Sequence, residues 1–95
     1  MRLDTDHGPF ELIKDHKEAF EVKSFNERYI PYFDKYTFIV GDISAEKLRL
    51  KGFMEDDVQM IPDFLMESAV PNAPYFIVKR VGDPPNRDEE ETDES

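Results

Sequence analysis

Two short apolar runs constrain the fold of this chain more than any other feature of its sequence. They are Tyr36–Asp42 and Tyr75–Val81, and in both the apolar residues occupy positions of both parities. Successive side chains of a β-strand point to opposite faces of its sheet, so a strand of this kind is apolar on both faces. Each run is also too short for a typical helix. The sequence therefore predicts two strands that are buried on both faces.

Two further runs have the pattern of strands that are only half buried. Phe10–Lys14 alternates well enough to form a first strand, and Lys47–Met54 alternates cations with apolar residues. Alternation is typical of a strand with one face on the core and the other in solvent, as at the edge of a sheet. The linker between Asp42 and Lys47 is short enough for an antiparallel hairpin.

The segment after the first strand carries helix signals. Asp15 and Glu18 have the spacing of a capping box, which predicts a single short turn, and Ser24 and Glu27 repeat that spacing. Pro31 interrupts the second segment and predicts a kink or two short helical pieces. An aromatic stripe at helical spacing runs through this segment, and core packing explains it better than a ligand site. Its members are Phe25, Tyr29, Tyr32, Phe33 and Tyr36.

A second helix is expected near Pro62, which fits the first helical position, with Phe64, Leu65 and Met66 as its apolar cover. The predicted order of elements is β-α-β-β-α-β. It indicates an α+β fold with a small antiparallel-rich sheet and two helices. A ferredoxin-like sheet would place the first and third strands in its centre, whereas here the second and fourth are apolar on both faces. The strand order stays open.

The charge of the chain is concentrated at its C-terminal end. Residues 83–95 contain seven acids and one base, so they carry −6 of the total net charge of −10. We therefore expect a flexible leader at residues 1–9, a single α+β domain at 10–82 and a disordered acidic tail at 83–95. The acidic balance argues against a general nucleic-acid binder, because phosphate contacts need a positive surface.

Compartment and membrane signals are sparse in the sequence. The chain contains no cysteine, so it can form neither disulfides nor a cysteine metal site. The first residues lack the apolar region of a signal peptide, and no apolar run approaches the roughly 20 residues that a membrane helix needs. These observations predict a cytoplasmic protein that does not enter a membrane.

The most distinctive candidate for a binding surface is an alternation of cations. Lys47, Arg49 and Lys51 fall at every second residue and therefore share one face of their strand. Lys79 and Arg80 lie on opposite faces of the last strand, so one of the two can join them. Three interpretations stay open: a binding strip for an anionic partner, the solvated face of an edge strand, and a surface screened by the acidic tail.

The two histidines are the only residues that invite a catalytic interpretation. His7 and His16 have aspartates beside them, which leaves open a small metal-dependent hydrolase that uses them with Asp4, Asp6 or Asp15. No third ligand converges with either histidine in the sequence. We therefore predict no catalytic residue, no metal and no cofactor.

Five segments of the chain form a recognisable set: ELIKDHKEAF, FNERY, DKYTFIVGD, LRLKGF and YFIVKR. Together they resemble the YutD-like family of small uncharacterised proteins from Gram-positive bacteria. The end of the IVGD strand, followed by LRLKGF at this spacing, is the most specific part, whereas residues 54–74 match poorly. The resemblance implies a compact α+β domain from a bacterial cytoplasm, and it implies no established activity. Arg49 and Lys51 belong to the matched motif, and Lys47 stands outside it.

The leading hypothesis is a non-enzymatic interaction module that binds an anionic partner, a protein or an RNA, through the basic strand. An RNA-binding accessory or regulatory protein is the first alternative, although Lys51-Gly52-Phe53 matches only the start of the RNP1 signature and is followed by acids. The metal-dependent hydrolase is the second. The chain is expected to be a monomer or a weak homodimer that covers the second apolar face of its central strands.

Overall fold

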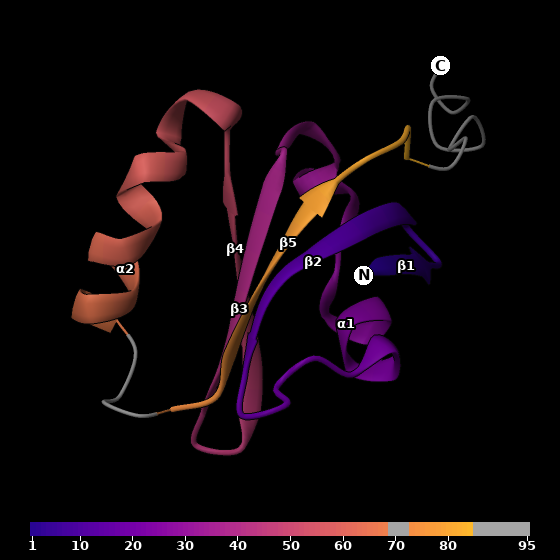
Figure 1. The fold of residues 1–95 in the computed structure, drawn as a ribbon. Coiled ribbons are helices and arrows are strands. Elements are labelled where there is room, and N and C mark those ends of the chain that lie inside the picture. Colours follow the sequence, from indigo (N-terminus) through magenta and orange to yellow (C-terminus); the bar gives the residue numbers. More distant parts are fainter. Residues whose placement is uncertain (69–72, 85–95) are drawn as a thin grey trace.

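The computed structural model describes residues 1–68 and 73–84, which form a five-stranded sheet with helices on both faces (Figure 1). The predicted acidic tail lies outside the described residues from position 85 onward. In chain order the elements are β1 (Arg2–Thr5), β2 (Gly8–His16), α1 (Val22–Arg28), the 3₁₀ helix η1 (Pro31–Lys35), β3 (Phe38–Ser44), β4 (Lys47–Phe53), the 3₁₀ helix η2 (Glu55–Met60), α2 (Ile61–Ser68) and β5 (Tyr75–Arg80).

The sheet has the strand order β1-β2-β5-β3-β4, and every neighbouring pair is antiparallel. The two runs that are apolar on both faces, β3 and β5, lie side by side in its interior. Ile39 and Val40 on β3 and Phe76 and Val78 on β5 are all buried. The alternating strand β4 is an edge strand and forms a hairpin with β3, as its pattern predicts. The α+β class is confirmed, and this order differs from the ferredoxin-like one.

One face of the sheet is covered by α1 and η1, which carry the aromatic stripe. Phe25 and Tyr29 are buried there against Phe10 and Phe76, so the core interpretation is confirmed for both stripe residues. Pro31 opens η1 one turn after α1 ends, which confirms the predicted division into two short pieces.

The opposite face is covered by α2, seen on the other side of the sheet from α1 in Figure 1. Val40, Phe53 and Ile61 form a second buried cluster there, with Phe64 and Leu65 of α2 packed against it. This face of β3 is therefore covered by α2 of the same chain, so a homodimer is not needed to cover it. The prediction that Met66 also covers the core is wrong, because its side chain is exposed. Among the described residues, the longest helix is far too short to cross a bilayer.

The predicted capping positions of Asp15 and Ser24 are wrong, because β2 extends past Asp15 and α1 begins before Ser24. Helix α1 begins at Val22, so Ser24 lies inside it and its hydroxyl donates to a Glu21 carboxylate oxygen at 2.8 Å. Strand β2 continues to His16. Asp15 accepts a hydrogen bond from the backbone N–H of Phe20 at 3.1 Å, and the chain turns at residues 17 and 18.

The predicted flexible leader at residues 1–9 is wrong, because it contains β1 and the start of β2. Leu3 pairs with Phe10 in this hairpin and is buried at the edge of the core. The turn is closed by the Thr5 hydroxyl, which donates to the Gly8 carbonyl at 2.8 Å, and Gly8 has a φ of 110° that favours glycine. A four-residue strand with one inward apolar side chain has too little periodicity to be recognised in the sequence.

Candidate functional site

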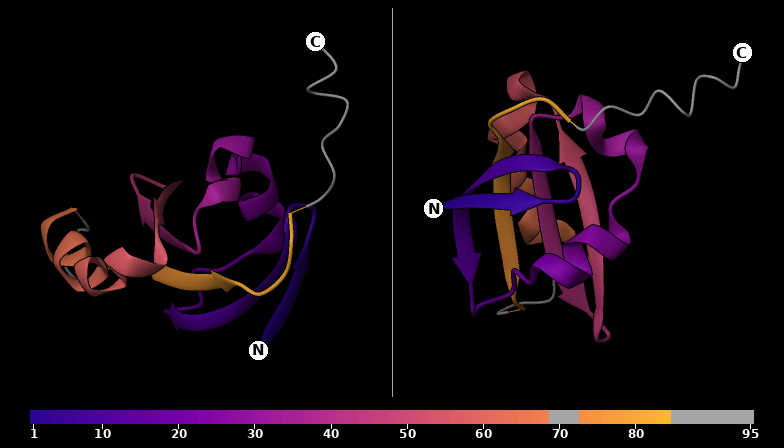
Figure 2. Two further views of the ribbon diagram at one scale, coloured as in Figure 1. Left: turned by 90° about the horizontal axis from the view of Figure 1, so that it is seen from above. Right: turned by 90° about the vertical axis from the view of Figure 1, so that its right-hand side faces the viewer.

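The three alternating cations of β4 occupy one face of the sheet edge. Across the β3–β4 ladder, Lys51 lies opposite Val40, Arg49 opposite Asp42 and Lys47 opposite Ser44. Val40 belongs to the cluster under α2, so these cations are on the α2 side of the sheet. The leucines between them, Leu48 and Leu50, pack against the core on the other side. Figure 2 shows β4 at one end of the sheet, with β1 and β2 at the other.

Arg49 is tied to the fold by a two-pronged ion pair. Its Nε and Nη2 donate to the two carboxylate oxygens of Asp42 at 3.1 and 2.8 Å. The Asp42 side chain is only 3% exposed, whereas that of Arg49 is 50% exposed. The hydrogen bonds to Asp42, and then its charge, raise the pKa of Arg49. The first role of Arg49 is therefore to compensate a buried carboxylate, with the outer part of its guanidinium at the surface.

Lys47 and Lys51 are exposed on either side of Arg49. Lys79 of β5 shares their face, because it pairs with Phe38 of β3, and its ammonium lies 5.9 Å from the centre of the Phe38 ring. Lys79 is therefore the cation of β5 that joins the strip, separated from β4 by one strand. We call Lys47, Arg49, Lys51 and Lys79 the basic face.

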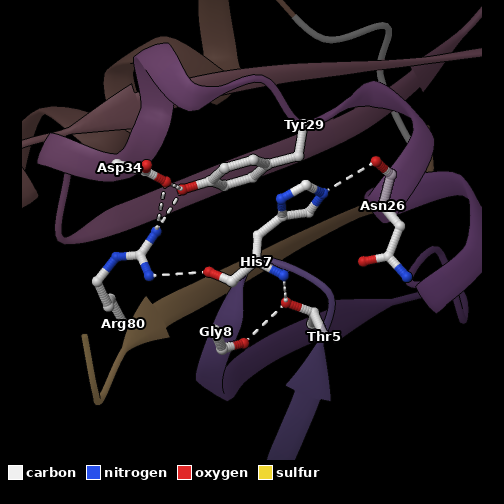
Figure 3. Close-up of polar contacts among 7 residues, drawn as sticks. All are labelled: Thr5, His7, Gly8, Asn26, Tyr29, Asp34 and Arg80. Atoms are coloured by element: carbon white, nitrogen blue, oxygen red, sulfur yellow. Dashed lines mark hydrogen bonds and ion pairs between the residues drawn. The ribbon is translucent and has the colours of Figure 1, made fainter. Parts of the chain in front are cut away.

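Arg80 does not belong to the basic face, because it is buried on the opposite side of the sheet (Figure 3). Its side chain is 10% exposed and lies with its guanidinium 4.6 Å from the ring centre of Phe10. Nη1 donates to the His7 carbonyl at 3.1 Å, Nη2 donates to the Tyr29 hydroxyl, and Asp34 lies 3.8 Å away. The Tyr29 hydroxyl in turn donates to Asp34 at 2.7 Å. We call this set the Arg80 network. It joins β5 to α1, η1 and the N-terminal hairpin, and the prediction of Arg80 as a binding residue is not supported.

The two histidines stack on different tyrosines. The His7 ring stacks on Tyr29 at 4.2 Å, and its Nε2 lies 3.1 Å from the Asn26 carbonyl, as Figure 3 shows. His16 stacks on Tyr75 at 5.1 Å. Within residues 1–68 and 73–84, no three His, Asp or Glu side chains come together in a way that could hold a metal ion.

A tyrosine pair near β4 is a surface feature that the sequence analysis does not predict. The hydroxyls of Tyr32 and Tyr36 are 2.9 Å apart, and the Lys35 ammonium lies 4.5 and 5.3 Å from the two ring centres. Tyr36 packs on Gly52, where any Cβ would overlap its ring. Tyr32 is 56% exposed, although it occupies a position in the aromatic stripe. The break at Pro31 is the signal that could have shown that the helical spacing does not continue to Tyr32.

The tyrosine pair has an electrostatic connection to β4. The hydrogen bond from Tyr36 lowers the pKa of Tyr32, and the charges of Lys35 and, less strongly, Lys51 lower it further. The same hydrogen bond raises the pKa of Tyr36. The charge of Lys51 on the α2 side of β4 thus lowers the pKa of Tyr32, which lies on the α1 side.

Comparisons with known proteins agree on one family. A family model described as "Putative antitoxin YutD-like" matches residues 4–79. "Putative antitoxin YutD" from Bacillus subtilis (strain 168) is 32% identical over 84 residues, which cover 79% of this chain and 92% of that protein. The solution NMR structure of protein yutD from B. subtilis superimposes with a TM-score of 0.76 at 28% identity, covering 92% of this chain and 87% of that one. The α+β fold seen here is therefore also the fold of that relative.

Proposed function

Since the chain belongs to the YutD-like family, we propose that it is a non-enzymatic module that binds an acidic surface of a partner protein through its basic face. The observation that carries this proposal is the exposure of Lys47 and Lys51 beside Arg49 on an edge strand of a chain with a net charge of −10. The family description names an antitoxin, which by definition acts against a toxin. That description supports a macromolecular partner.

The basic face can attract an acidic partner although the whole chain is acidic. Ionic screening at physiological salt limits the reach of a surface charge to about 8 Å. The nearest carboxylate across the ladder, Asp42, is already neutralised by Arg49. Across the ladder, Lys47 and Lys51 lie opposite Ser44 and Val40 and not opposite a carboxylate. Complementary charge raises association rates and selects the partner.

A protein partner is favoured over RNA by what surrounds the cations. β4 carries no aromatic side chain on its basic face before Phe53, and Phe53 is buried under α2. Single-stranded RNA recognition depends on exposed aromatic rings on which bases stack. Because the chain contains no cysteine, the interaction is compatible with a reducing compartment, and we propose the cytoplasm as its location.

The competing explanation is that the lysines only keep the edge of the sheet from pairing with other chains. Affinity purification from the native host distinguishes the two, with protein and nucleic acid both recovered and identified. The bait is the full chain as wild type and as the charge-reversed variant Lys47→Glu/Lys51→Glu. The matched control is Lys14→Glu/Lys23→Glu, which makes the same change at exposed positions of β2 and α1.

We expect a protein that is retained by the wild type and by the control, is lost from the basic-face variant, and is released as salt is raised. Retention of the same proteins by all three baits would reject the proposal. If nuclease removes the retained material instead, the RNA alternative holds. Arg49 is left unchanged in this experiment, because its removal would leave the buried Asp42 uncompensated.

A further inference from the structure

The outer edge of β4 presents backbone groups that no other described strand uses. Among the described strands, β4 is the last in the sheet and pairs only with β3. The Ile43 N–H donates to Pro74 and the Arg80 N–H donates to Thr37, so the odd-numbered residues of β3 direct their backbone groups to the β5 side. The even-numbered residues of β3 therefore bond to β4.

That alternation assigns a direction to each backbone group of β4. Its odd-numbered residues, which include Lys47, Arg49 and Lys51, lie opposite the even-numbered residues of β3 and make the ladder bonds. The N–H and C=O groups of Leu48, Leu50 and Gly52 consequently point outward from the sheet. Such a row of backbone groups is a template for adding an extended segment as a further strand.

Cations flank this edge on both faces. Lys47, Arg49 and Lys51 line the α2 side, and Lys35 lies over the tyrosine pair on the other side, where Tyr36 packs on Gly52. An added strand would place every second side chain next to the β4 cations and the others next to Leu48 and Leu50. Cross-strand neighbours of opposite charge stabilise a sheet, and apolar neighbours do so on the other face.

We propose that the outer edge of β4 takes up an extended segment of the partner protein, in which acidic and apolar residues alternate, as a sixth strand. This inference rests on the proposed function and names the form of its partner. A second copy of this chain is a poor occupant, because antiparallel pairing of two β4 edges would bring a set of three cations against an identical set. Like charges directly opposite one another destabilise a strand pair.

Amide hydrogen exchange tests the added strand, because it reports on each backbone N–H separately. The probe is a blocked synthetic peptide of sequence TEVEVEVT, added to the full-length protein. We expect exchange to slow at least tenfold at Leu48, Leu50 and Gly52. The amides of Arg49 and Lys51 should change little, because β3 already protects them.

Two variants and one control peptide complete the experiment. Leu48→Pro removes an outward N–H that the fold does not use, and proline is tolerated on edge strands when its nitrogen faces solvent. We expect this variant to lose the peptide, while Leu48→Ala, which also lacks the leucine side chain but keeps the N–H, retains it. The peptide TKVKVKVT should not bind. If Leu48→Pro does not fold, the inference is tested by the wild type alone, through the protection of the Leu48, Leu50 and Gly52 amides on addition of the peptide.

Binding of TEVEVEVT without the alternating protection would overturn strand addition. It would leave the proposed function intact, because a charged contact through side chains would remain. No binding of the peptide would also overturn this inference, whereas the proposed function fails only if the partner is retained after charge reversal of Lys47 and Lys51.

Discussion

The basic face and the Arg80 network place the cations of one sheet in different surroundings. Lys47 and Lys51 are exposed on an edge strand, whereas Arg80 is buried between β5, η1 and the N-terminal hairpin. Lys79 and Arg80 are neighbours in sequence, yet they lie on opposite faces of the sheet. Adjacent positions of β5 thus place one cation on the α2 side of the sheet and the other in a mostly buried network. Arg49 is intermediate, because it compensates Asp42 and still reaches the surface.

The largest effect on stability is expected for Arg80→Met. The change leaves Asp34, the Tyr29 hydroxyl and the His7 carbonyl without their shared donor in a mostly buried site. Loss of a hydrogen-bonded charge of this kind lowers the free energy of unfolding by about 3 kcal/mol. Urea denaturation measures this loss, and Lys79→Met is the control on the adjacent residue, with an expected loss below about 1 kcal/mol. Equal losses in the two variants would contradict the distinction between the faces.

Arg49→Met should lower stability by a smaller amount, because water reaches half of this side chain. The cause is the buried Asp42 carboxylate, which loses both of its guanidinium hydrogen bonds. A double-mutant cycle with Asp42→Asn isolates the pair: once the carboxylate is gone, removal of Arg49 should cost less. Additive effects of the two changes on the urea midpoint would show that the ion pair does not couple them.

Charge reversal at Lys47 and Lys51 should leave stability within about 0.5 kcal/mol of the wild type, because both side chains are exposed. The expected consequence is confined to binding, with partner affinity reduced at least tenfold at physiological salt and less at high salt. Titration of the purified partner at two salt concentrations measures this. If the variant unfolds, Lys47 and Lys51 are needed for stability, and the contrast with Arg80 is contradicted.

The smallest effect is expected for Lys35→Met, which tests the electrostatic link on the other side of β4. Lys35 favours the phenolate of Tyr32, so its removal should raise the pKa of Tyr32 toward its ordinary value of 10.0. Ultraviolet titration of the tyrosines follows this change. Because the pKa of Tyr32 is lowered in the fold, its ionisation adds stability as pH rises through that pKa, and the raised pKa of Tyr36 opposes this gain. Stability should therefore rise as pH approaches 10.0 from below and fall again above it. A titration curve of the variant identical to that of the wild type would contradict the link.

The sequence predicts the sheet better than its termini and caps. Strands β3 and β5 follow from short continuous apolar runs, and β4 follows from the alternation of cations with apolar residues. β1 is not predicted, because a single inward leucine does not make a periodic pattern. Its position is fixed by the pairing of Leu3 with Phe10 of β2, which a local sequence pattern does not show. The local capping signal predicts that the helix starts at Ser24. In the structure α1 begins at Val22, and Phe25 and Tyr29 are buried in the core.

The sequence by itself determined which residues alternate, and therefore that Lys47, Arg49 and Lys51 share a face and that Lys79 and Arg80 do not. This follows from the geometry of a single strand. Only the tertiary structure decided which face is which, because that depends on where α1, η1 and α2 pack and on strand order. It placed Arg80 under Tyr29 and His7, joined Arg49 to Asp42, and left the outer edge of β4 unpaired among the described residues. Contacts between residues far apart in sequence leave no periodic signal in it. These contacts distinguish Arg49 and Arg80, which are bonded within the fold, from Lys47 and Lys51, which are exposed.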